Sequence, residues 1–335
     1  MQNILSVSAN ASVENNPIIF GPIHSRRFGM SLGIDLSPTL KQCNFDCLYC
    51  ELAPSATVEK QIQTVNPETI INELQSHLSE TIDVITLTAN GEPTLYPHLN
   101  KLLDEIDRIK KTTDTLILTN SAMLNDEKVF ETLLKFDQVK LSLDAVSADI
   151  FKKIDRPHKE IDISQLIENV IAFSHLYKGK LFIEILFVHE LNDTKEEIEK
   201  LNKVLKKIQC TRVDLGTIDR PPAYPVVGIS YKELHTISLM FDASIPIHIA
   251  SRIRAESNHN YYSKEAILNT LDKRPLTMDD IHLLFDTASL AHLAELLQEQ
   301  KVIKKVVSNL EFLLPEENEN RKRKKSSKPL TFHNS

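Results

Sequence analysis

Three cysteines, Cys43, Cys47 and Cys50, lie within eight residues of a 335-residue chain that contains only one other cysteine, Cys210. A disulfide framework would need paired cysteines and a secreted context, and a closed zinc site would need a fourth ligand at finger-like spacing. Thiolates are the usual ligands of iron–sulfur clusters, and three of them on a four-iron cluster leave one iron open. The cluster of thiols therefore indicates a metal centre that can do chemistry, with a zinc site or a purely structural cluster as alternatives.

The C-x3-C-x2-C spacing, with Tyr49 just before the last cysteine and the strand-like Ser31–Leu36 ahead of it, resembles the radical S-adenosylmethionine (radical SAM) superfamily. The resemblance implies that the three cysteines hold a four-iron, four-sulfur (4Fe-4S) cluster and that its open iron chelates SAM, with Tyr49 in the cofactor site. It also implies that an external donor of flavodoxin or ferredoxin type supplies an electron. SAM is then cleaved to a 5′-deoxyadenosyl radical that abstracts hydrogen from a substrate, which the sequence does not identify. We expect an oxidoreductase of this kind.

A second motif, Asn90-Gly91-Glu92-Pro93, follows the expected strand Val84–Thr88. It resembles the Gly-Glu-Pro motif of the superfamily, which implies hydrogen bonds to the amino group of SAM. Glycine allows a close approach of the backbone to a ligand, and proline fixes the turn. Asn90 stands where the family often has a further glycine, and asparagine tolerates unusual backbone angles.

Short polar side chains end the next two expected strands. Asn120 follows one strand, and Ser142 and Asp144 lie at the end of the other. The resemblance implies that these groups bind the ribose hydroxyls and the methionine carboxylate of SAM, whereas ordinary strand-end and helix-cap roles are the alternative. Glu184 lies inside a later strand and is left out of the site, because pairing with a lysine or exposure to solvent is equally consistent with strand alternation.

Six strands alternate with helices along the chain, which predicts a parallel sheet with helical crossovers that curls toward a barrel. The resemblance makes this a partial (β/α)6 TIM-like barrel of the α/β class, whose chemistry gathers at the carboxyl ends of the strands. Asn66 and Pro67 are expected to begin one helix, and Thr194 with Glu197 to form a capping box on another. The expected strands are Ser31–Leu36, Val84–Thr88, Thr115–Thr119, Val139–Leu143, Leu181–Val188 and Arg212–Thr217.

Glycines and a proline between Phe20 and Gly29 predict a turn that carries Arg26 and Arg27. An arginine fork suits a carboxylate or phosphate, so these residues either bind an anion near the cluster or pair with carboxylates of the protein. A segment of this kind also resembles the subgroup related to the wybutosine-synthesis tRNA enzymes. One extra cysteine, Cys210, cannot supply a second cluster, and it is expected to be a small buried residue.

The expected organisation is a polar leader (1–17), the barrel with an edge extension (18–250), a small domain (260–315) and a disordered basic tail (316–335). Three helical segments and two short strands, Val302–Val307 and Leu310–Leu314, make the small domain resemble a winged helix. Its third helix has no Lys or Arg from residue 287 to 300, so DNA binding is not expected. The basic run in the tail, residues 321–328, could hold RNA electrostatically.

The composition fits a folded protein with 41% hydrophobic residues and a formal net charge of −7, which excludes a whole-protein polyanion binder. No apolar run approaches the ~20 residues that a membrane helix needs, and the first residues lack a signal pattern. We expect a cytoplasmic location, because a cluster and unpaired thiols suit a reducing compartment. The substrate could be an RNA or a protein. The alternatives are an RNA- or tRNA-modifying radical SAM enzyme and an iron–sulfur regulator in which the winged helix reads DNA.

Overall fold

The computed structural model describes residues 17–25, 27–79, 81–249, 259, 261–273, 275–307 and 310–316. Residues 1–16 of the polar leader, Arg26, the link at Ser308 and Asn309, and residues 317–335 of the basic tail lie outside the described residues, so the predictions about them remain predictions. Among the described helices, none has both the length and the apolar character needed to cross a membrane.

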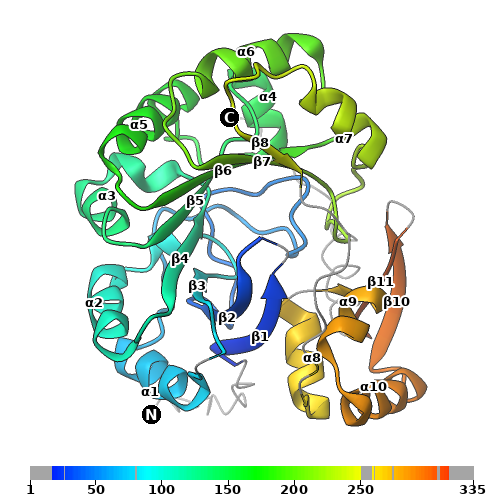
Figure 1. Ribbon diagram of the computed structural model, residues 1–335. Helices are drawn as coiled ribbons and strands as arrows, with labels where there is room; N and C mark the ends of the chain where they lie inside the picture. The colour runs from blue at the N-terminus through cyan, green and yellow to red at the C-terminus, as the bar shows by residue number, and fades with distance from the viewer. Residues whose placement is uncertain are drawn as a thin grey trace, which may run out of the picture.

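A mostly parallel eight-stranded sheet forms the centre of the molecule, and the strands follow the order β1 to β8 across it (Figure 1). Neighbouring strands from β2 to β8 pair in parallel, whereas β1 pairs with β2 in the antiparallel direction. The strands are β1 (Ile19–Ser25), β2 (Gly29–Asp35), β3 (Val84–Thr88), β4 (Asp114–Thr119), β5 (Gln138–Ser142), β6 (Lys180–Phe187), β7 (Arg212–Thr217) and β8 (Ile247–Ile249). The α/β class and the curled parallel sheet are confirmed, and the six expected strands agree with β2 to β7 within two residues.

The turn predicted between Phe20 and Gly29 is only partly correct, because most of this segment is strand β1 and the turn comes after it. The register of the β1–β2 pair shifts between Phe20 and Ile23, so Gly21 and Pro22 lie in an irregular stretch of an edge strand. Gly21 has a φ of +99°, and proline has no N–H to give to a ladder. An irregular edge strand tolerates both residues, which is why the turn signals were misleading. In the part of the chain that the structure describes, the turn between β1 and β2 consists of Arg27 and Phe28.

Helices cover the convex side of the curved sheet, as Figure 1 shows. They are α1 (Pro67–His77), α2 (Leu99–Ile109), α3 (Glu127–Leu133), α4 (Ala148–Ile154), α5 (Ile163–Leu176), α6 (Lys195–Leu205) and α7 (Tyr231–Ser238), with short 3-10 helices η1 (Pro93–Leu95) and η2 (Ala122–Asn125). The main core lies between these helices and the sheet and includes Ile85, Leu87, Ile183 and Ile185. Alternation along the strands then turns Thr86, Thr88, Glu184 and Leu186 to the concave side, which we call the lumen.

Two helix starts test the predicted capping. The side chain of Asn66 accepts a hydrogen bond from the N–H of Glu68 at the start of α1, as expected. Thr194 accepts from the N–H of Glu197, but Glu197 does not complete the predicted box. Its carboxylate instead accepts from the N–H of Val146 at 2.6 Å and from that of Ser147 at 2.9 Å. Glu197 therefore ties α6 to the segment before α4.

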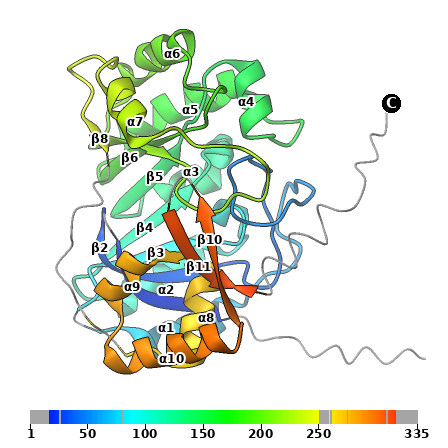
Figure 2. The same cartoon turned by 90° about the vertical axis from the view of Figure 1, so that its right-hand side faces the viewer.

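The C-terminal unit contains three helices and a small antiparallel sheet of order β10-β11-β9. Its elements are α8 (Lys264–Lys273), β9 (Leu276–Thr277), α9 (Met278–Leu284), α10 (Thr287–Gln298), β10 (Val302–Val307) and β11 (Leu310–Pro315). The three helices and the antiparallel pair of strands are confirmed, strand β9 is an addition, and Thr277 and Asp280 form a capping box at the start of α9. Figure 1 places this unit beside β1, where α8 packs and where the hydroxyl of Tyr262 donates to the carbonyl of Pro22, and Figure 2 shows the unit from its own side.

Candidate active site at the carboxyl ends of the strands

The three cysteines of the first motif lie in the long loop between β2 and α1, which we call the cysteine loop (residues 36–66). All three are half-buried free thiols. The N–H of Phe45 donates to Sγ of Cys43 at 3.4 Å, and Nδ2 of Asn120 lies 3.8 Å from the same sulfur. Donors of this kind stabilise a thiolate, and hydrogen bonds to sulfur are typical of iron–sulfur sites.

Burial strongly affects the thiols. It raises the pKa of Cys43 to about 12, and it raises the pKa of Cys47 and Cys50 as well. The ammonium group of Lys41 opposes this at Cys50 and Cys43, because a positive charge nearby favours the thiolate. Thiols that ionise poorly on their own become thiolates when they bind a metal.

The donor set, three free cysteines on one loop, fits a four-iron cluster. In the part of the chain that the structure describes, no three His, Cys, Asp or Glu side chains converge on one metal ion. In a four-iron cluster each thiolate binds a different iron, so three neighbouring but separated thiols are suitable ligands. Cys43, Cys47 and Cys50 are therefore the residues that would hold the cluster.

Gly91 joins the second motif to the cysteine loop. The N–H of Gln42 donates to the carbonyl of Asn90 at 2.9 Å, and the N–H of Glu92 donates to the carbonyl of Gln42 at 3.0 Å. Gly91 has a φ of +141°, and a Cβ atom on it would lie 1.9 Å from the carbonyl oxygen of Gln42. Glycine is thus required for the two backbones to lie against each other. Because Gln42 precedes Cys43, this contact positions the first ligand.

Glu92 holds the ends of β3 and β4 together. Its carboxylate is 2% exposed and accepts from Oγ1 of Thr119 at 2.6 Å, from the N–H of Asn120 at 2.8 Å, and from both N–H and Oγ1 of Thr94 at 3.0 and 2.6 Å. Burial raises the pKa of Glu92. Pro93 begins η1 directly after it. The side chain of Glu92 thus stabilises the mouth of the lumen, and the role in SAM binding assigned to the motif stays a prediction.

The polar groups predicted at the ends of β4 and β5 do come together. Nδ2 of Asn120 donates to Oδ1 of Asn44 at 2.7 Å, and Oγ of Ser121 donates to the carbonyl of Ser142 at 2.9 Å. Asn120, Ser142 and Tyr49 line one small cavity of about 10 Å³, which is enough for about one water molecule.

Tyr49 and Asp144 belong to a buried acidic network next to Cys47. The hydroxyl of Tyr49 donates to Asp144 and lies 3.4 Å from Oδ1 of Asp155. Asp144 also accepts from the N–H of Leu186 at 2.7 Å. Burial raises the pKa of Asp144 to about 6, and burial together with the Asp144 carboxylate raises that of Asp155. Both oxygens of Asp144 therefore have partners within the protein, and its predicted contact with SAM is untested.

A larger cavity of about 480 Å³ occupies the lumen. At the carboxyl ends of the strands it is lined by Asp35, Cys50, Glu51 and Asn90, and Glu51 pairs with Arg220. A cavity of this volume is typical of sites for small molecules. Cys50 and Asn90 of the second motif thus line the same cavity, in which two ligands could meet.

Sequence reasoning missed several charged residues of this region. Asp46, between the cysteines, accepts from Nζ of Lys41 at 3.0 Å and from the hydroxyl of Tyr224, and it pairs with Arg156. No local pattern marks these partners. Glu184 was left out of the site although it lines the lumen. Ile183 and Ile185, on either side of it, are buried against the helices. Because side chains alternate along a strand, these two isoleucines were the available signal that Glu184 faces the lumen.

The sequence pattern of the radical SAM superfamily matches residues 37–213, which is more than half of the chain and includes both motifs. The chain therefore belongs to the radical SAM superfamily, whose members carry a 4Fe-4S cluster and bind SAM. A UPF0026 protein of Helicobacter pylori is 40% identical over 303 residues, covering 89% of this chain and 98% of the relative. Within the superfamily the chain thus belongs to the UPF0026 family.

Solved structures agree on the fold. A radical SAM methyltransferase from Sphaerobacter thermophilus superposes with a TM-score of 0.52 at 16% identity, over 65% of this chain and 65% of that one. This likeness supports the partial barrel and says nothing about the reaction. An archaeal TYW1 matches 68% of this chain and 75% of its own at 16% identity, with a TM-score of 0.45, which is too low to support an argument about the subgroup.

Proposed function

We propose that this protein reductively cleaves SAM at a cluster held by Cys43, Cys47 and Cys50, and that it acts on a substrate bound in the lumen. The junction at Gly91 carries this proposal, because it fixes the cysteine loop against the second motif beside a cavity that Cys50 lines. A structural or regulatory cluster gives no reason for either the second motif or the cavity.

When bound, the cluster and SAM supply the radical chemistry, a reductive cleavage that yields a hydrogen-abstracting 5′-deoxyadenosyl group. The protein's own residues have simpler tasks. Lys41, whose Nζ is bonded to Asp46, places a positive charge beside the thiolates. Glu92 keeps β3 and β4 together, and Tyr49 donates a hydrogen bond to Asp144. These contacts fix the positions of the groups around the cysteines, which suits a site that must orient its ligands.

The test is anaerobic reconstitution with iron and sulfide, reduction with dithionite, addition of SAM and chromatography for 5′-deoxyadenosine. The wild-type chain should bind iron and form the product, and Cys47→Ala should lose both. Cys210→Ala is the matched control, because this cysteine lies outside the cysteine loop, and it should behave as wild type. A wild-type chain that takes up no iron would refute the proposal.

The electron is proposed to come from an acidic flavodoxin- or ferredoxin-type donor. The surface that would receive this donor is segment 152–159, which lies against the cysteine loop. The N–H of Leu48 in that loop donates a hydrogen bond to the carbonyl of Ile154 at 2.8 Å. Segment 152–159 presents the exposed side chains of Lys152, Lys153 and Lys159. Clustered surface cations steer an acidic partner. The double variant Lys152→Glu with Lys153→Glu should slow reduction of the cluster by flavodoxin, and reduction by dithionite should be unchanged.

The basic tail and the C-terminal unit bear on the class of substrate. An RNA or a protein substrate remains our proposal, and deletion of residues 316–335 with retained activity would count against a role of the tail. We take the C-terminal unit as a winged-helix-like module for protein contact or for covering the substrate, since α10 has no Lys or Arg to bind DNA. A relation to the wybutosine-synthesis subgroup and a cytoplasmic location are proposed on the sequence alone.

A further inference from the structure

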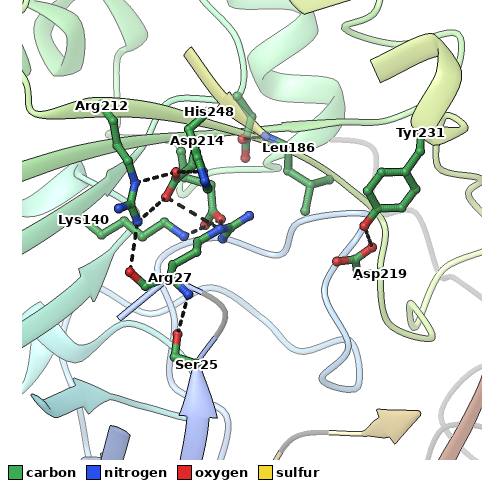
Figure 3. Close-up of polar contacts among 11 residues, drawn as sticks. Ser25, Arg27, Lys140, Leu186, Arg212, Asp214, Asp219, Tyr231 and His248 are labelled. Carbon is green, nitrogen blue, oxygen red and sulfur yellow. Dashed lines mark hydrogen bonds and ion pairs between the residues drawn. The ribbon is translucent and has the colours of Figure 1, made fainter. Parts of the chain in front are cut away.

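Charged side chains from four elements meet at the amino side of the lumen, which we call the lumen floor (Figure 3). Arg27 comes from the turn between β1 and β2, Lys140 from β5, Glu184 from β6, and Arg212 and Asp214 from β7. Nη1 of Arg27 lies 2.6 Å from Oε1 of Glu184, and Lys140 donates to the same oxygen. Nε of Arg212 lies 2.8 Å from Oδ1 of Asp214.

The lumen floor has more positive than negative charge. Three cations, Arg27, Lys140 and Arg212, are in direct contact with two carboxylates, Glu184 and Asp214. Asp219 acts on Arg27 and Arg220 acts on Glu184 from outside this group, and their opposite charges offset each other. Nδ1 of His248 also contacts Asp214, at 3.0 Å, and adds no negative charge. The side chain of Lys140 is only 6% exposed and that of Asp214 is fully buried. An uncompensated charge in such surroundings is unfavourable, so an additional anion would stabilise it.

The pKa values reflect this imbalance. The two cations beside it lower the pKa of Glu184 to about 2 despite its burial, so this carboxylate is fully ionised. Burial lowers the pKa of Lys140 to about 8, and the positive charge of Arg27 contributes. The lysine is therefore the group that would gain most from a second anion.

The opposite end of the same cavity has more negative charge. Asp35, Glu51 and Asp219 lie at the carboxyl ends of the strands, with Arg220 as the neighbouring cation. The cavity is thus polarised from a negative mouth to a positive floor. A sulfonium group such as that of SAM is positively charged and suits the mouth. An anion suits the floor.

Donors of the lumen floor can reach a ligand. Both Arg27 and Lys140 line the cavity. A Cβ atom on Gly216 would lie 3.9 Å from Nη2 of Arg27 and 3.9 Å from the carbonyl oxygen of Ile185, and these two atoms would be its nearest neighbours. Glycine at 216 therefore leaves room in front of the guanidinium group. Phe28, Leu118 and Leu186 supply apolar walls.

We propose that the substrate carries a carboxylate or phosphate group and that Arg27 and Lys140 bind this group at the lumen floor. An arginine fork and a lysine ammonium are the side chains best suited to either anion. The cavity volume of about 480 Å³ admits a small molecule or a single extruded unit of a polymer. Calling this ligand the substrate rests on the proposed function, whereas the anion site itself does not.

The test is isothermal titration at pH 7 of the anaerobically reconstituted full-length chain, with SAM present, using inorganic phosphate in one arm and acetate in the other. The wild-type chain should bind at least one of them, and the preferred arm identifies the anion class. Lys140→Met should weaken binding about 10-fold or more, as expected for loss of one charge-assisted hydrogen bond. Glu184→Gln raises the net charge of the floor and should tighten binding.

Lys101→Met is the matched control, because it makes the same substitution at an exposed ion pair with Glu68 on the outer surface. It should bind the anion as wild type does. No binding by the wild-type chain, or equal binding by wild type and Lys140→Met, would overturn the inference. The opposite responses expected for Lys140→Met and Glu184→Gln exclude a general folding defect as the cause. Heat of anion binding and formation of 5′-deoxyadenosine are separate readouts, so this inference and the proposed function can fail independently.

Discussion

Replacing Gly91 by alanine should uncouple the two motifs of the site. The new Cβ would lie 1.9 Å from the carbonyl oxygen of Gln42 and 2.4 Å from its carbonyl carbon. Both are backbone atoms, so no side-chain rotation can relieve the overlap. The backbone at φ +141° is also one that residues other than glycine rarely adopt.

The magnitude follows from these contacts. A residue forced into such a backbone region costs about 1–3 kcal/mol. The two hydrogen bonds between Gln42 and the loop after β3 must also open, at about 0.5–1.5 kcal/mol each. The free energy of unfolding of Gly91→Ala should therefore fall by about 2–6 kcal/mol, a large part of the 5–15 kcal/mol typical of a domain. Iron content after reconstitution should fall as well, because Cys43 follows Gln42.

Urea unfolding of the metal-free chain and iron analysis of the reconstituted chain are the measurements. Gly216→Ala is the control, because its Cβ would have no neighbour closer than 3.9 Å. At such a site alanine should be neutral or stabilising by up to about 1 kcal/mol. If Gly91→Ala and Gly216→Ala have the same stability and the same iron content, the backbone contact does not position the cysteine loop.

Three further predictions concern buried charges. Glu197→Ala should lower the free energy of unfolding by about 2–4 kcal/mol in urea titrations, because the buried N–H groups of Val146 and Ser147 lose their acceptor, and Glu197→Gln should recover part of the loss. Lys41→Met should lower the reduction potential of the reconstituted cluster in a titration followed by electron paramagnetic resonance, because a nearby cation favours the reduced state; an unchanged potential would contradict this. Anion binding should weaken as the pH rises through about 8, where Lys140 loses its proton, and the calorimetric affinity of Lys140→Met should lack this step between pH 7 and 9.

Local patterns carried most of what the sequence could predict. The thiol spacing, the strands β2 to β7 and the capping of α1 by Asn66 all depend on residues close to one another in the chain. The second motif was recognisable for the same reason. Its glycine also has a task that the motif alone does not reveal, because the partner of Gly91 is the backbone of Gln42.

The sequence could not predict interactions between side chains that lie far apart in the chain. Arg27 bonds to Glu184, 157 residues away, and only the curl of the sheet brings the β1–β2 turn under β6. Strand alternation could place Glu184 in the lumen but could not name its partner. Glu197 shows that a local pattern can also mislead. Its spacing from Thr194 predicted a capping box. In the structure its carboxylate instead accepts hydrogen bonds from the buried N–H groups of Val146 and Ser147, about 50 residues away.

An open barrel leaves two strand edges that could pair with other chains and aggregate. The protein protects each edge differently. β8 is only three residues long, Ile247–Ile249, and offers little backbone to a partner strand. β1 is longer, but Pro22 interrupts its ladder, α8 packs against it, and Ile23 is buried in the core of the C-terminal unit. A chain truncated before residue 260 would uncover this edge, so we expect solubility to be lost before catalysis can be measured.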